Sequence, residues 1–187
     1  METSELHRRA AAGFDKHVQA TGDDDWRLPT PNAEWDVRAL VNHLTYENKW
    51  CVPLLQGSTV DEVGGAFEGD LLGTNPKEAW SQSLREAEAA VQAEGALERT
   101  VHLSSREPPG EEYVFELFID LLIHSWDLAR GIGGDERLDD DLVKICYEKN
   151  KPHEQMIRDA GVFGSHVEVD EDADLQTRLL ALFGRTA

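Results

Sequence analysis

The chain has 187 residues, which is enough for one domain with a sizeable core. Its 37 acidic and 18 basic side chains give a formal charge of −19, which disfavours binding to nucleic acids and to anionic membranes. No apolar run reaches the ~18 residues of a membrane span, and the polar N-terminus lacks the apolar core of a signal peptide. With only two cysteines, Cys51 and Cys146, we expect a cytoplasmic protein with free thiols.

The first helix is expected over residues 3–20, where apolar residues recur every four positions (Leu6, Ala10, Phe14 and Val18). Prolines and a run of aspartates keep residues 21–35 from being helical. A connection of this length would let the second helix run parallel to the first. That second helix is predicted to begin after the N-cap residue Asp36 and to end near Cys51, before Pro53.

The second helix carries a histidine on or beside its apolar side. His43 shares that side with Glu47 and Trp50. Taken alone, His43 is typical of a buried core histidine, and Glu47 of a solvent-facing residue or one that supports a metal ligand. His17, on the first helix, is a weaker candidate of the same kind.

Residues 54–75 are irregular and rich in glycine, with one short helical turn expected at 60–63, and loops this long often border functional sites. A third helix is predicted from Pro76 to near Gly95. The alternation of apolar and polar residues predicts short strands at 99–103 and 166–169.

The central helix is expected over 111–130, and it carries Asp120 and His124 four residues apart. Four residues advance a helix by ~400°, so the two side chains lie one turn apart on the same face. Leu117, Leu121 and Leu128 lie near that face, so it should point inward. Buried polar groups need partners, and two partners fit here: a divalent metal held by both residues, or a direct Asp–His hydrogen bond. The stretch alone does not choose between them.

Further helices are expected at 139–160 and 174–183, which completes an all-α chain. We expect a single domain over residues 1–187, with 165–187 as a small C-terminal appendage. No glycine-rich phosphate loop, Gly-x-Ser-x-Gly or Cys-x-x-Cys motif is present, which disfavours nucleotide, serine-hydrolase and dithiol redox chemistry.

Two motifs, in this order, resemble a known family: Trp35-Asp-Val-Arg-Ala-Leu-Val-Asn-His43-Leu, and Asp120-x-x-x-His124-x-x-Asp127-Leu-Ala-Arg130. They are similar to the DinB-like (YfiT-like) metal-binding helical bundles, and most to the actinobacterial branch that includes the N-terminal domain of mycothiol-dependent maleylpyruvate isomerase. The resemblance covers roughly residues 3–160. It implies a four-helix bundle with long crossover connections.

The same resemblance implies a divalent metal, usually zinc, held by His43, Asp120 and His124. Members of the family carry histidine or glutamate at the position of Asp120. Two histidines and a carboxylate also suit nickel or iron, so either metal is compatible with this ligand set. Around the ligands we expect a supporting group or pocket of five residues: Arg38, Glu47, Trp50, Asp127 and Arg130. Asp127 either orients a ligand or forms an ion pair with Arg38 or Arg130.

Members of this family use mycothiol, bacillithiol or glutathione. The resemblance therefore implies a thiol-dependent transferase or isomerase that acts on a small electrophile, with mycothiol as the natural cosubstrate. Two alternatives stay open: a non-catalytic metal-binding stress or regulatory protein, and a metal-free bundle used for interaction. A homodimer is compatible with the sequence, which does not fix the oligomeric state. Neither cysteine has basic or metal-binding surroundings in the sequence that would make it reactive.

Overall fold

The computed structural model describes residues 1–160, 167–170 and 172–187. Throughout these ranges the regular structure is helical and no strand ladder forms. None of the described helices is both long enough and apolar enough to cross a membrane. The chain divides into two compact units, Met1–Gly134 and Asp135–Ala187. The single domain with an appendage at residues 165–187 stays a prediction.

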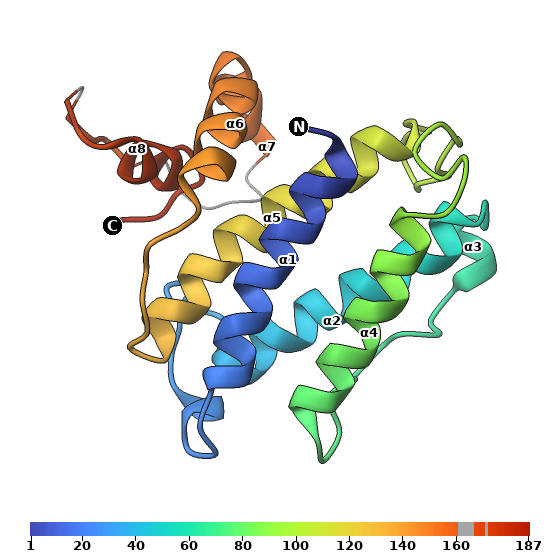
Figure 1. Ribbon diagram of the computed structural model, residues 1–187, viewed down its shortest axis with the longest axis horizontal. Helices are drawn as coiled ribbons and strands as arrows, with labels where there is room; N and C mark the ends of the chain where they lie inside the picture. The colour runs from blue at the N-terminus through green and yellow to red at the C-terminus, as the bar shows by residue number, and fades with distance from the viewer. Residues whose placement is uncertain (161–166, 171) are drawn as a thin grey trace. The chain divides into compact units, whose positions relative to one another are not determined.

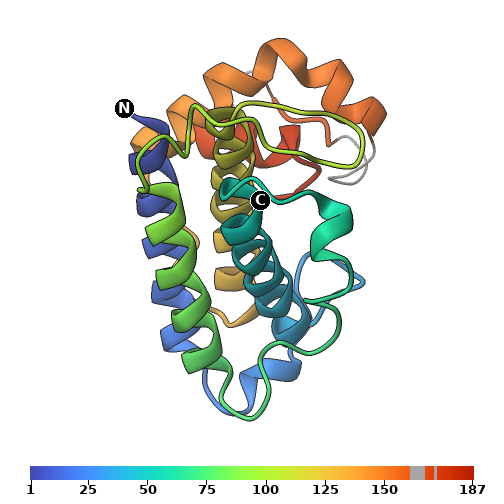
Figure 2. The ribbon, with the colours of Figure 1, turned by 90° about the vertical axis from the view of Figure 1, so that its right-hand side faces the viewer.

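Four long helices form the bundle of the first unit: α1 (Thr3–Ala20), α2 (Val37–Leu55), α4 (Pro76–Val91) and α5 (Gly110–Gly131). The most extensive packing is of α1 along α5 and of α2 along α4, and α2 also contacts α5. Figures 1 and 2 show that α1 and α5 run in one direction and that α2 and α4 run in the other. The expected all-α four-helix bundle is confirmed.

The connection between α1 and α2 folds back on itself. It contains the short 3-10 helix η1 (Asp25–Arg27), and the Thr30 amide donates to the Trp35 carbonyl at 3.3 Å. The Val37 amide then donates to the Leu28 carbonyl at 3.0 Å. Because the turn is closed by its own hydrogen bonds, α2 begins at the end of the bundle where α1 stops. The prediction that these helices run parallel is wrong.

The crossover is made by residues 56–75, which include α3 (Val60–Val63) and return along α2. The Asn42 side chain donates to the Gly69 carbonyl and accepts from the Leu71 amide, at 3.1 and 2.8 Å. One turn earlier, Arg38 binds both carboxylate oxygens of Asp70 and the Gly73 carbonyl. This returning segment makes α2 and α4 parallel, so the bundle has a long crossover here and not at residues 21–35, where the sequence suggested one.

Helix α2 extends through Pro53 to Leu55, four residues beyond the expected end at Cys51. Proline near a helix end forfeits one backbone hydrogen bond without breaking several turns. Leu54 and Leu55 are buried, at 2% and 1% exposure, so their burial favours continuing the helix. By contrast, α4 ends at Val91, short of the expected Gly95.

Residues 99–103 form isolated bridges in place of the expected strand. Thr100 pairs with Pro109, and His102 pairs with Thr59 of the crossover. A single bridge on each side does not build a ladder, so the alternating sequence here supports a folded loop. The loop is fixed against α5, because the Gly110 amide donates to the Arg99 carbonyl at 2.7 Å.

In the second unit, the expected continuous helix over 139–160 is divided into α6 (Asp140–Asn150), the 3-10 helix η2 (Lys151–His153) and α7 (Glu154–Ala160). Pro152, which has no amide hydrogen to donate, lies in the 3-10 segment. Helix α8 (Leu175–Leu182) is capped by Asp174, and Arg178 donates to the Tyr147 hydroxyl of α6. Of the strand predicted at 166–169, residue 166 lies outside the described residues and 167–169 form no strand.

Two glycines of the bundle give opposite stability predictions. A Cβ at Gly110 would lie 2.1 Å from the Ala96 carbonyl oxygen, which is backbone. Overpacking of this kind costs about 1–3 kcal/mol, so Gly110→Ala should lower the free energy of unfolding by at least that much. Gly13 lies inside α1, and its nearest contact would be Ser125 Oγ at 3.8 Å.

The matched control, Gly13→Ala, should therefore raise the free energy of unfolding by about 0.5–1 kcal/mol, because alanine is the better helix former. Urea denaturation of both variants measures the two effects. Equal effects of the two substitutions would contradict the close approach of residues 96–97 to the start of α5.

Candidate metal centre

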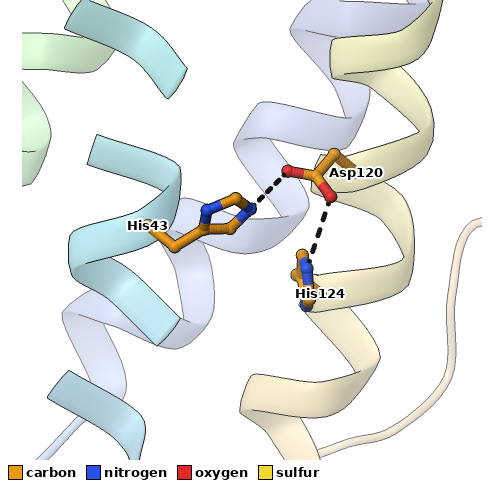
Figure 3. A group of neighbouring side chains, drawn as sticks. All are labelled: His43, Asp120 and His124. Carbon is orange, nitrogen blue, oxygen red and sulfur yellow. Dashed lines mark hydrogen bonds and ion pairs between the residues drawn. The ribbon is translucent and has the colours of Figure 1, made fainter. Parts of the chain in front are cut away.

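His43, Asp120 and His124 meet where α2 faces α5 (Figure 3). His43 Nε2 lies 3.0 Å from Asp120 Oδ2, and His124 Nε2 lies 3.3 Å from Asp120 Oδ1. Each imidazole thus contacts a different oxygen of one carboxylate. The structure thus brings together three residues of which the first and the last, His43 and His124, are 81 positions apart in the sequence.

The local sequence explains why each side chain points to this seam. The Asp36 carboxylate caps α2 by accepting from the Ala39 amide at 2.8 Å, which fixes where the helix begins. Two turns later His43 lies beside the fully buried Leu44. On α5, Asp120 and His124 are one turn apart, and the helix is buried on most of its surface.

Asp127 supports His124 from the far side of its ring. Its Oδ2 lies 2.8 Å from His124 Nδ1, and both side chains are buried, with 0% and 5% side-chain exposure. A hydrogen bond from Nδ1–H to Asp127 leaves Nε2 of the neutral ring free to bind a cation on the Asp120 side. This contact is the one that a ligand-orienting role for Asp127 requires.

Burial and charge–charge interactions together set the pKa values of the ionisable groups at the site. Burial raises the pKa of Asp120, but the charge of His124 and hydrogen bonds from both histidines outweigh it and hold that pKa below its usual range. Burial lowers the pKa of His124. The Asp120 carboxylate and the hydrogen bonds to Asp120 and Asp127 outweigh this effect and raise the pKa of His124 to about 9. Burial, followed by the charge of Asp120, raises the pKa of Glu47 to about 7.

The geometry fits a divalent metal. One ligand atom from each of the three residues lies within 4.8 Å of the others. Ligand atoms about 2.1 Å from one tetrahedral zinc are roughly 3.4 Å apart. The His43 and His124 Nε2 atoms lie 3.0 and 3.3 Å from different oxygens of Asp120, so these separations are of the size that a shared ion requires, although they do not meet at one oxygen. Two imidazoles and one carboxylate suit zinc, nickel and iron and leave at least one coordination position open.

Access to the site is uneven. The side chains of His43 and Asp120 keep 26% and 20% of their surface exposed, whereas His124 keeps 5%. Glu47, one turn after His43, places its Oε1 4.0 Å from His43 Nδ1 and is 28% exposed. An incoming molecule therefore reaches the His43–Asp120 side of the site.

Trp35 lies at the site, a position that was not predicted from the sequence, where this residue was named only as the first of a motif. The Trp35 ring lies 4.6 Å from the His43 ring and 5.6 Å from the His124 ring, centroid to centroid. The available signal was its place immediately before the N-cap Asp36, at the start of the motif that ends in His43.

The contacts described for the other residues that the sequence singled out are with groups other than the three candidate ligands. Trp50 packs with Tyr46 and Phe67, two helical turns beyond His43. Arg38 binds the crossover through Asp70, as described above. The Arg130 guanidinium lies 4.1 Å above the Trp126 ring. His17 is buried and is not among the three residues that could share a metal in the described part of the chain.

An all-α bundle that gathers two histidines and a carboxylate from facing helices defines a DinB-like fold with a possible metal site. Comparison with models of known protein families shows that the chain belongs to the mycothiol maleylpyruvate isomerase N-terminal domain family, whose model matches residues 7–129. That match includes all three candidate ligands. Uncharacterized proteins from two strains of Mycobacterium tuberculosis are each 26% identical over 148 residues, which is 76% of this chain and 74% of the relative. No solved structure matched the chain.

The Asp127–His124 contact predicts a metal-affinity effect. Asp127→Asn keeps the shape of the side chain but removes the charge that fixes the His124 ring, and losses of about 10–100-fold in metal affinity are usual for such partners. Competition with a chromophoric chelator measures the affinity. Asp23→Asn removes the same charge from an exposed position and is the control. Equal affinities of the two variants would show that Asp127 does not orient a ligand.

Proposed function

We propose that this chain binds one divalent metal, zinc in the first place, through His43, Asp120 and His124. The metal would bind and activate a small cosubstrate thiol. The observation that carries the proposal is the convergence of one ligand atom from each residue to within 4.8 Å. The thiol is mycothiol, in keeping with the family to which the chain belongs. The reaction is transfer to, or isomerisation of, a small electrophile.

A divalent metal, when bound, would lower the pKa of a coordinating thiol and so supply a nucleophile near neutral pH. The chain's own residues would hold the metal and orient its ligands. Asp127 keeps the His124 ring in one tautomer, with Nε2 toward Asp120. His43 and Asp120 form the accessible side, with Glu47 at its edge. A cosubstrate and an electrophile would meet there.

The proposed thiol comes from outside the chain, because both cysteines are poor nucleophiles. Burial and the charge of Glu47 raise the pKa of the Cys51 thiol to about 12. Burial also raises the pKa of Cys146 to about 12, against a hydrogen bond from Asn150. Both side chains are 0% exposed, so neither is available to a substrate. Buried free thiols of this kind suit a reducing cytoplasm.

The first prediction from this proposal is a stoichiometry of about one metal per chain after the metal-free protein is reloaded and dialysed. His124→Ala should lose nearly all of the metal, because it removes one of three ligands, while circular dichroism shows that the helices persist. His102→Ala, at a half-exposed histidine paired with Glu107, should keep the metal. Elemental analysis makes the measurement.

A metal content near zero with zinc, nickel and iron alike would reject the proposal and favour a metal-free interaction bundle. One nickel or iron per chain would change only the identity of the metal. Retention of metal by His124→Ala would mean that the ligands are wrongly assigned.

The second prediction concerns the source of the thiol. The double variant Cys51→Ala, Cys146→Ala should keep the metal content of the parent and react with 1-chloro-2,4-dinitrobenzene only when mycothiol is added. Absorbance of the dinitrophenyl thioether follows the reaction. Activity that disappears in the double variant while the metal remains would assign the nucleophile to a cysteine of the chain. Absence of any thiol-dependent reaction in a metal-loaded parent would favour the non-catalytic alternative.

A further inference from the structure

Trp35 contacts both candidate histidine ligands although it belongs to neither of their helices. Its ring is tilted by 37° to the His43 ring and by 41° to the His124 ring, at centroid distances of 4.6 and 5.6 Å. The two imidazoles are themselves 5.4 Å apart, nearly edge to face. The indole therefore lies over the pair and not beside one ring only.

The backbone around Trp35 holds the indole in this position. The Trp35 carbonyl accepts from the Thr30 hydroxyl at 2.8 Å and from the Thr30 amide at 3.3 Å. The Trp35 amide donates to the Asn32 carbonyl at 2.9 Å, and the next residue, Asp36, caps α2. A turn closed by these bonds fixes the direction of the side chain relative to the start of α2.

Trp35 and Glu47 lie on opposite sides of His43 along the direction of α2. Trp35 precedes α2, whereas Glu47 lies one turn after His43 and 4.0 Å from its ring. Three protein ligands leave one or two positions for other molecules on a divalent metal. A large indole over both imidazoles occupies the space that a ligand approaching from the start of α2 would need.

We propose that Trp35 closes one face of the metal site and confines exchangeable ligands to the Glu47 side. This inference rests on the metal binding proposed above and adds the class of ligand that the site accepts. With one face closed, the site favours ligands with a single donor atom, such as a thiolate, over those that need two adjacent positions. The indole also stabilises the imidazoles when they gain positive charge on binding a metal.

The test uses the full chain loaded with cobalt(II), whose visible absorption is strong at four or five ligands and weak at six. The parent should show the strong band, and Trp35→Ala should lose most of it because water enters the uncovered face. Acetohydroxamate, which binds through two oxygens, should bind Trp35→Ala at least several-fold more tightly than the parent. Trp26→Ala, at another half-buried tryptophan of the same connection, is the control and should match the parent.

Trp35→Phe provides a second measurement if the alanine variant does not fold. Cobalt should quench tryptophan fluorescence in the parent, and Trp35→Phe should lose most of that quenching while keeping the strong absorption band. Unchanged quenching in Trp35→Phe, or a Trp35→Ala spectrum equal to that of Trp26→Ala, would overturn the role of Trp35 and leave the metal site standing. A parent that binds no cobalt would instead reject the proposed function itself.

Discussion

The Asp120 carboxylate, shared by two imidazoles from different helices, is the interaction on which the candidate site depends. A carboxylate with only a fifth of its side chain exposed needs positive partners, and His43 and His124 supply them at 3.0 and 3.3 Å. The charge of His124 and the hydrogen bonds from both histidines hold the pKa of Asp120 below its usual range, so the carboxylate stays ionised and would bind a cation once the imidazoles lose their protons. Direct hydrogen bonds and a shared metal are thus two uses of one arrangement, and a metal at this site would replace the hydrogen bonds on binding.

The meeting of these residues requires a fixed register of α2 against α5, and much of that register is set outside the site. Arg38 and Asn42 bind the returning crossover on the outer side of α2. The closed turn before Asp36 fixes the start of the same helix and carries Trp35 to the two histidines. Residues that are not candidate ligands therefore decide where the candidate ligands lie.

The bounds of α1 and α5 and the inward direction of Asp120 and His124 could be predicted, because helical periodicity is a local property. Joining His43 to them needed the resemblance to a family, since spacing alone cannot align two helices. The direction of α2 could not be predicted, because it depends on hydrogen bonds within residues 21–36. The end of α2 was placed too early because a proline in the last turn of a helix costs few backbone hydrogen bonds, as at Pro53. The break at residues 151–153 was missed because Pro152 lies within a stretch that otherwise has a helical pattern. Arg38 was expected near the site as a possible partner of Asp127, and its partner Asp70 could not be identified because it lies 32 positions away along the chain.

A crystal structure of the zinc-loaded protein, with anomalous data collected at the zinc absorption edge, would test whether one metal lies between His43, Asp120 and His124. We expect a single strong anomalous peak about 2.0–2.2 Å from Nε2 of both histidines and from an Asp120 oxygen. A zinc-loaded crystal with no peak at that position, or with its peak on other residues, would show that these three residues do not hold the metal.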